Sequence, residues 1–133
     1  MAITITGHFG SGVSTYARRL ICGEFEPRLF EDLNSTFQHG NDDEEVSINI
    51  CRTVEGVAKS DGVVILYDSM HEYDKIVPYI EECKKLGIPY VVCLTKVDVA
   101  NQSIRFAKKC KHILLSTKSC YNLYKPIEKL LGH

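Results

Sequence analysis

A glycine-rich turn follows the first apolar stretch of the chain, and its residue types suit the binding of phosphate. The turn reads Gly7-His8-Phe9-Gly10-Ser11-Gly12-Val13-Ser14-Thr15, which has the frame of the pattern G-x-x-x-x-G-K-[ST] between a predicted strand and a predicted helix. Glycines allow backbone N–H groups to curl around phosphate oxygens, and the helix N-terminus adds a favourable dipole. The predicted contact residues are Gly7, Gly10, Ser11, Gly12, Val13, Ser14 and Thr15.

The lysine of this pattern is missing, because Val13 occupies its position. Losing one charge-assisted hydrogen bond costs about 1.5–3 kcal/mol, which corresponds to roughly ten- to hundredfold in affinity. Ser14 keeps the hydroxyl that ligates Mg²⁺ in such loops and is the predicted metal ligand. His8 is predicted to face solvent, although a protonated imidazole there can donate to phosphate. Taken alone, the glycine frame fits a purely structural turn equally well.

Two further motifs come at the ends of predicted strands, where ligands of doubly wound sheets bind. The first, Thr95-Lys96-Val97-Asp98, matches the guanine-reading pattern [NT]-K-x-D. A carboxylate at Asp98 can accept both N1–H and the exocyclic amine of guanine, and the Lys96 stem can lie along the base. The second, Ser116-Thr117-Lys118, matches the S-A-K element, whose backbone amide meets guanine O6. Three motifs in this order predict a guanine-nucleotide site.

The elements that position these motifs alternate between strands and helices, which predicts a mostly parallel sheet with helices on both faces in a single α/β domain over residues 1–133. The predicted strands cover residues 2–6, 46–51, 62–67, 89–95 and 112–115, and the predicted helices 14–22, 73–86, 102–110 and 121–131. Residues 27–45 are polar and end in the acidic run 42–45. This segment predicts a solvated hairpin tip or mobile loop, with an acidic metal site as a minor alternative.

Composition narrows the class of protein. The chain has 133 residues and a formal net charge of −1, which argues against bulk binding to nucleic acid or to an anionic membrane. No apolar run approaches the roughly 20 residues of a membrane span, and the first residues lack the features of a signal peptide. The six cysteines form no C-x-x-C pair, so we expect reduced thiols in an intracellular protein of the cytoplasm or nucleus.

With its three nucleotide motifs, the chain resembles the Ras superfamily of small GTPases, and within it most closely the Ran family. The resemblance covers nearly the whole chain and is carried by the nucleotide motifs together with three surface segments: Gly23-Glu24-Phe25-Glu26, Tyr73-Asp74-Lys75-Ile76-Val77-Pro78, and Tyr121-Asn122 followed by Lys125-Pro126. It implies a three-layer P-loop fold that binds GTP or GDP. No prenylation cysteine stands at the C-terminus.

The departures from the family lie where hydrolysis and switching reside. In place of D-T-A-G-Q the chain has Arg52-Thr53-Val54-Glu55-Gly56, so Arg52 replaces the Mg²⁺-supporting carboxylate and no glutamine orients the attacking water. The helix that should follow is nearly absent, and Thr36 is a weak match for the threonine that senses the γ-phosphate.

Arg52 has two open interpretations. Its guanidinium can point toward the phosphates and pair with them bidentately without metal, or it can face solvent or pair with the acidic run 42–45. Either way, Mg²⁺ binding is doubtful. Because phosphoryl transfer depends on positioned charge, we expect no efficient GTP hydrolysis and weak or no nucleotide binding. The alternative is a constitutive guanine-nucleotide binder, at most a very slow GTPase.

A basic cluster suggests a protein partner. Its members are Arg105, Lys108, Lys109 and Lys111, with His112 beside them. A solvated helix face is the ordinary interpretation of such a cluster. The resemblance implies instead a contact with acidic surfaces of importin-β-type transport receptors or other proteins that bind the Ran family. The resemblance also places Asp68, at a strand end, as a residue that stabilises its loop.

Overall fold

A computed structural model describes residues 2–8, 10–22, 34–39, 44–96, 101–116 and 121–132. At positions 21–22, 34–39, 44–47 and 101–102 only the backbone is described. The described strands form one six-stranded sheet in the order β2-β3-β1-β4-β5-β6. β3, β1, β4, β5 and β6 run parallel, and β2 is antiparallel to β3. The predicted α/β class is therefore confirmed.

Alternation along the strands creates two cores, one on each face of the sheet. The strands are β1 (Ala2–Gly7), β2 (Asn34–His39), β3 (Glu44–Ile50), β4 (Gly62–Tyr67), β5 (Tyr90–Leu94) and β6 (Ile113–Leu114). In β4 every residue is buried, as expected for a strand covered on both sides. Val64 and Leu66 belong to one core, whereas Val63, Ile65 and Tyr67 belong to the other.

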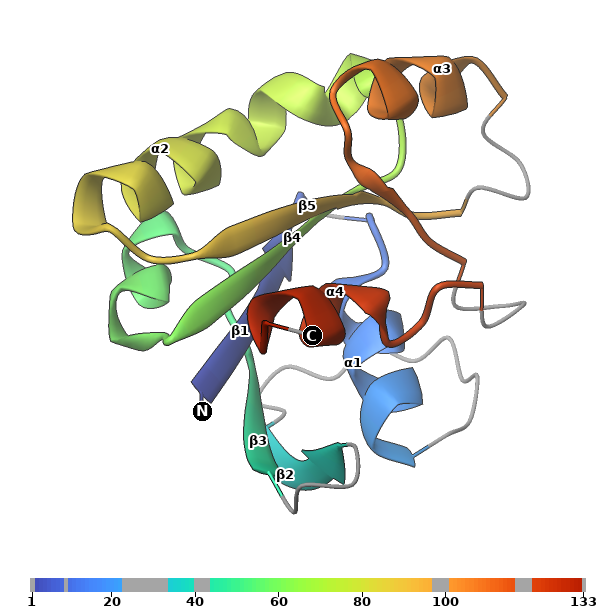
Figure 1. Cartoon of the computed structure of the whole chain (residues 1–133). Helices are drawn as coiled ribbons and strands as arrows, with labels where there is room; N and C mark the ends of the chain where they lie inside the picture. The colour runs from blue at the N-terminus through green and yellow to red at the C-terminus, as the bar shows by residue number, and fades with distance from the viewer. Residues whose placement is uncertain are drawn as a thin grey trace.

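Helices cover both faces and make three layers. α1 (Val13–Cys22) and α4 (Lys125–Leu130) contribute to the first core, and α2 (Val77–Leu86) and α3 (Asn101–Lys109) to the second. Figure 1 shows these two pairs on opposite sides of the sheet. The hydroxyl of Tyr16 in α1 donates to the carbonyl of Leu123 at 2.8 Å, which ties α1 to the approach of α4. Within the described part of the chain, no helix combines the length and apolar character that crossing a membrane requires.

Two predicted helices begin later than expected, and proline explains both. Residues Met70–Lys75 form the 3₁₀ helix η2, and α2 starts only at Val77, with a proline in its first turn. Residues 121–124 form a bridge and turn before α4, which again has a proline in its first turn. Proline is favoured at the first helical position because it lacks the N–H that would bond to a preceding turn.

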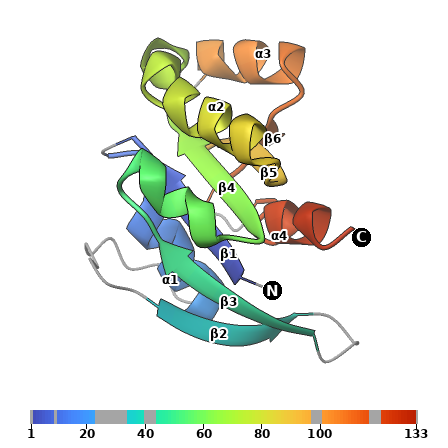
Figure 2. The same cartoon turned by 90° about the vertical axis from the view of Figure 1, so that its left-hand side faces the viewer.

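The prediction of a solvated hairpin tip or mobile loop over residues 27–45 is wrong at Asn34–His39, which form β2, and at residues 44–45, with which β3 begins. Pairing sets Asn34, Thr36 and Gln38 opposite Asn49, Ser47 and Glu45. One face of this strand pair is thus polar, so the sequence lacks a strong apolar alternation there. Figure 2 shows β2 and β3 as a ribbon at one edge of the sheet. After β3, the sequence predicts that the helix of the family is nearly absent. The structure has only the short 3₁₀ helix η1 (Val54–Lys59) there, which buries Val57.

Candidate functional site

The glycine loop, residues 7–14, joins the end of β1 to α1. Gly10 and Gly12 have φ angles of 87° and 93°, a region that residues with a side chain rarely adopt. A Cβ on Gly7 would lie 2.4 Å from the carbonyl oxygen of Leu66, so the loop packs directly on the backbone of β4. The glycines are therefore required by the shape of the turn.

Two residues at the end of β5 hold this loop. Thr95 Oγ1 donates to the carbonyl oxygen of Ser11 at 2.8 Å, and Lys96 Nζ donates to that of Gly10, also at 2.8 Å. Lys96 has a positive φ of 57°. The sequence allows the Lys96 stem to lie along a base but does not reveal this bond of its ammonium group to the loop. The motif that begins at Thr95 and the glycine loop are thus one connected unit.

His8 is buried, so the prediction that it faces solvent is wrong. Its Nε2 lies 3.0 Å from Asp68 Oδ1, and Asp68 Oδ2 lies 3.3 Å from Lys96 Nζ. Asp68 therefore connects the glycine loop to the end of β5, in agreement with the loop-stabilising role expected for it. The contact between His8 and Asp68 could have been predicted from the order of strands, because the ends of adjacent parallel strands meet at the same edge of the sheet.

Arg52 points into the site. Its Nη2 donates to Ser14 Oγ at 2.8 Å, in the direction that the first of its two interpretations requires, while the residue is exposed, as the second requires. The acidic run 42–45 lies outside the described side chains. One of the five N–H donors of a guanidinium is used by this bond. Arg52 also lines a hollow of about 430 Å³ between the end of β3 and η1, together with Lys59. Val13, at the position of the absent lysine, is buried in the core that α1 shares with the sheet.

The donor set does not fit Mg²⁺. The hydroxyl of Ser14, the predicted metal ligand, accepts a bond from a cationic group, and Arg52 places positive charge where a metal would need carboxylate. Mg²⁺ takes oxygen ligands, commonly carboxylates, in octahedral geometry. Among the described residues, no group of three or more His, Cys, Asp and Glu is arranged to hold a metal.

The backbone N–H groups of the loop differ in what they bond to. Ser11 N–H bonds to the carbonyl of His8 at 3.1 Å, so it is used within the turn. The carbonyl of Gly12 accepts from Tyr16 N–H at 2.8 Å, which makes Val13, Ser14 and Thr15 the first turn of α1. The first N–H groups of a helix have no partner inside the helix. They are therefore the backbone groups in this site that suit an anion.

Some of the remaining predicted site residues are described by the structure and others are not. Asp98, Thr117 and Lys118 lie outside the described residues, as does Val97. Ser116 is buried, and its N–H bonds to the carbonyl of Tyr121 at 3.1 Å. On α3 and the turn after it, the four basic residues predicted for a partner are all exposed: Arg105, Lys108, Lys109 and Lys111. The four cysteines whose side chains are described, Cys51, Cys83, Cys93 and Cys110, are free thiols.

No protein-family model matches the chain, and no curated protein matches its sequence. The case for function therefore depends on the residues and geometry of this site.

Proposed function

We propose that the protein is a degenerate Ras-like G domain, which binds guanine nucleotide weakly and without Mg²⁺ and does not hydrolyse GTP efficiently. Its mostly parallel sheet with helices on both faces supports a P-loop fold. The glycine loop lies between the first strand and the first helix, as that fold requires. The base-reading part of the proposal depends on the sequence motifs that contain Asp98, Thr117 and Lys118.

The bond from Arg52 to Ser14 carries the proposal. In a metal-dependent loop this hydroxyl faces Mg²⁺, whereas here it accepts from a guanidinium at 2.8 Å. Arginine matches the geometry of phosphate and can pair with it through two parallel N–H bonds. A guanidinium at the start of α1 can therefore replace part of the charge that the missing lysine and the metal would supply.

Hydrolysis needs more than this charge. Catalysis of phosphoryl transfer depends on positioned cations and on a residue that orients the attacking water. The chain has neither the loop lysine nor the glutamine of the family pattern, and its metal-supporting aspartate is Arg52. A bound nucleotide is thus expected to persist rather than to be turned over.

The test is a titration of fluorescent GDP and GTP in Mg²⁺ and in EDTA, after mass spectrometry of any nucleotide released from the purified protein. Affinity should be the same in both buffers. Arg52→Ala should weaken binding roughly ten- to hundredfold, the value of one charge-assisted bond. Lys59→Ala is the matched control, because Lys59 lines the same hollow, and should change affinity less than twofold.

Asp98→Ala completes this test, since it removes the guanine-reading carboxylate. Binding should be abolished while the far-UV circular dichroism spectrum stays unchanged. Affinity that collapses in EDTA would show that a metal is required and would reject the role given to Arg52. GTP turnover accelerated by Mg²⁺ would reject the proposal as a whole.

A second function, contact with acidic surfaces of importin-β-type receptors, is favoured by one observation. The four basic residues of α3 and its following turn all present exposed side chains: Arg105, Lys108, Lys109 and Lys111. Charge complementarity of this kind mainly raises association rates and is sensitive to salt. Charge reversal of Lys108, Lys109 and Lys111 should abolish recovery of such a receptor in a pull-down. Equal recovery of both proteins would exclude this surface.

A further inference from the structure

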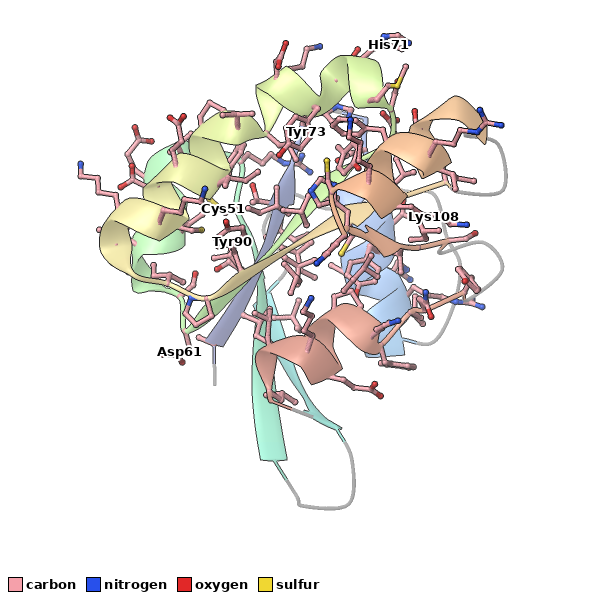
Figure 3. The ribbon with its side chains drawn as sticks, turned by 45° about the horizontal axis from the view of Figure 1, so that its top comes forward. Cys51, Asp61, His71, Tyr73, Tyr90 and Lys108 are labelled. Carbon is pink, nitrogen blue, oxygen red and sulfur yellow. The ribbon has the colours of Figure 1, made fainter. Side chains whose placement is uncertain are left out.

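A hollow of about 300 Å³ lies at the β6 edge of the sheet and is separate from the glycine loop. It is lined by residues of η2, α2, the start of β5, the turn between α3 and β6, the start of β6, and α4. Tyr73 and Tyr90, which line it, are labelled in Figure 3. We call it the lysine hollow, because Lys84, Lys111 and Lys129 belong to its lining.

The hollow exists because β6 is short. β6 pairs only with Cys93 and Leu94, so it does not extend beside the first half of β5. α3 ends at Lys109, and the turn after it closes with a bond from Lys111 N–H to the carbonyl of Lys108. Lys111 takes a positive φ of 61°. The chain thus reaches the sheet late and leaves a space beside Tyr90–Val92.

The charge of this lining is one-sided. Lys84 and Lys129 come from α2 and α4 and Lys111 from the turn after α3, and among the described residues no aspartate or glutamate lines the hollow. None of these three ammonium groups forms an ion pair with another described residue. The whole chain has a net charge of only −1, so this local excess is not a consequence of a basic composition. Three uncompensated lysines around one hollow attract an anion.

His112 adds a directed donor. Its Nδ1 lies 2.7 Å from the hydroxyl of Tyr67, a side chain that is fully buried. Burial raises the pKa of Tyr67 and lowers the pKa of His112, so both groups are neutral at pH 7. The buried phenol needs an acceptor, which Nδ1 provides. The imidazole proton is then on Nε2, where it can serve a ligand.

We infer that the lysine hollow binds a small phosphorylated molecule independently of the nucleotide loop. Lysine is a compact point charge that suits phosphate oxygens approached from several directions. Ile80, Val91 and Ile113 line the same hollow and give it an apolar wall. The ligand class is therefore a small molecule that carries more than one phosphate charge and fits about 300 Å³.

The test uses inorganic pyrophosphate and backbone amide NMR of the full chain at low ionic strength. Pyrophosphate should shift the amides of Lys111, His112 and Ile113. The triple variant Lys84→Gln, Lys111→Gln, Lys129→Gln should weaken the binding that these signals report at least tenfold. Shifts at the glycine loop report the other site and should be unchanged in this variant.

The matched control is Lys85→Gln, Lys108→Gln, Lys109→Gln. It removes the same charge from exposed lysines of α2 and α3 that do not line the hollow, and should change binding less than twofold. If both triple variants bind pyrophosphate equally weakly, the loss comes from net charge alone, and the site is rejected. Shifts confined to residues 10–14 would reject it as well, while leaving the proposed function intact. The melting temperature of each variant shows whether it is folded.

Discussion

The glycine loop and the lysine hollow both gather cationic side chains from several elements, but they use them differently. At the loop, Lys96 bonds to Asp68 and to the carbonyl of Gly10, and Arg52 bonds to Ser14. At the hollow, Lys84, Lys111 and Lys129 form no ion pair with described residues. Paired cations hold a structure in place, whereas unpaired cations keep their charge available for a ligand.

The pairing of the loop cations limits which parts of the loop can still bind phosphate. Lys96 is used by the fold, so its charge is largely offset by Asp68. The grip on a phosphate falls to the unused donors of Arg52 and to the first N–H groups of α1. Most of the polar contacts of the loop thus stabilise its conformation, and only a few donors can bind an anion.

The largest effect is expected where the loop touches the sheet. In Gly7→Ala the new Cβ would meet the backbone oxygen of Leu66 at 2.4 Å, and backbone cannot move aside cheaply. The free energy of unfolding should fall by about 3 kcal/mol or more. Gly10→Ala is the control, because nothing lies within 4 Å of its Cβ and only the positive φ is strained. It should lose about 1 kcal/mol in urea unfolding. Equal losses would contradict the close packing of Gly7.

The next effect concerns the bond that fixes the loop to β5. Thr95→Val keeps the shape but removes the hydroxyl that donates to the carbonyl of Ser11 in a buried setting. The unsatisfied carbonyl should cost about 1–3 kcal/mol in urea unfolding.

Thr53→Val is the matched control, because Thr53 is exposed, and should change stability by less than about 0.5 kcal/mol. A Thr95 variant as stable as the Thr53 variant would mean that the bond to Ser11 does not hold the loop.

Much of the fold follows from local patterns. The apolar run of β4 was predicted with its observed bounds, Gly62–Tyr67, because a strand buried on both faces has no polar position to blur it. β2 could not be predicted, since polar residues occupy one of its faces and its stability comes from pairing with β3. A buried strand leaves an apolar pattern that can be recognised in the sequence. A polar strand leaves no such pattern, because pairing with a distant segment decides whether it forms.

The site follows the same rule. The glycine loop was recognisable from spacing, because a tight turn needs glycine at fixed positions. The bonds from Thr95 and Lys96 to the loop depend on β1 and β5 both lying next to β4, which spacing alone does not reveal. Arg52 had two interpretations because its partner, Ser14, is 38 residues away. The lysine hollow left no local signal, since its three lysines come from two helices and a turn that are distant in sequence.

A smaller effect is expected from pH at the edge of the hollow. Burial lowers the pKa of His112 in the folded protein below its ordinary value of 6.5. As pH falls below that value the unfolded chain binds a proton that the folded protein resists, so stability decreases. Above that pH the histidine is neutral in both states and does not change the free energy of unfolding with pH.

The measurement is urea unfolding at several pH values from 8 to 5 for the wild type and for His112→Asn, which keeps a side-chain acceptor for Tyr67 but does not titrate. The wild type should lose more stability over this range, by less than one proton's slope of about 1.4 kcal/mol per pH unit. Parallel curves would show that His112 titrates alike in both states.

The smallest effects separate the two kinds of cation directly. Lys96→Met keeps most of the side-chain stem but loses the bond to Gly10 and the contact with Asp68. Because Lys96 is about half exposed, the loss in urea unfolding should be only about 0.5–1.5 kcal/mol. Lys84→Met removes a cation that has no ion pair among the described residues and should change stability by less than about 0.5 kcal/mol.

For pyrophosphate binding we expect the opposite order of effects, with the larger loss in the Lys84 variant. Lys84→Met should weaken the shifts at Lys111 and His112, because it removes one of the three charges of the hollow, while Lys96→Met should leave them unchanged. A cation that stabilises the fold would then be distinguished from one that serves a ligand by two independent measurements. If Lys84→Met costs as much stability as Lys96→Met, Lys84 has a structural partner, and its charge is no more available than that of the loop lysine.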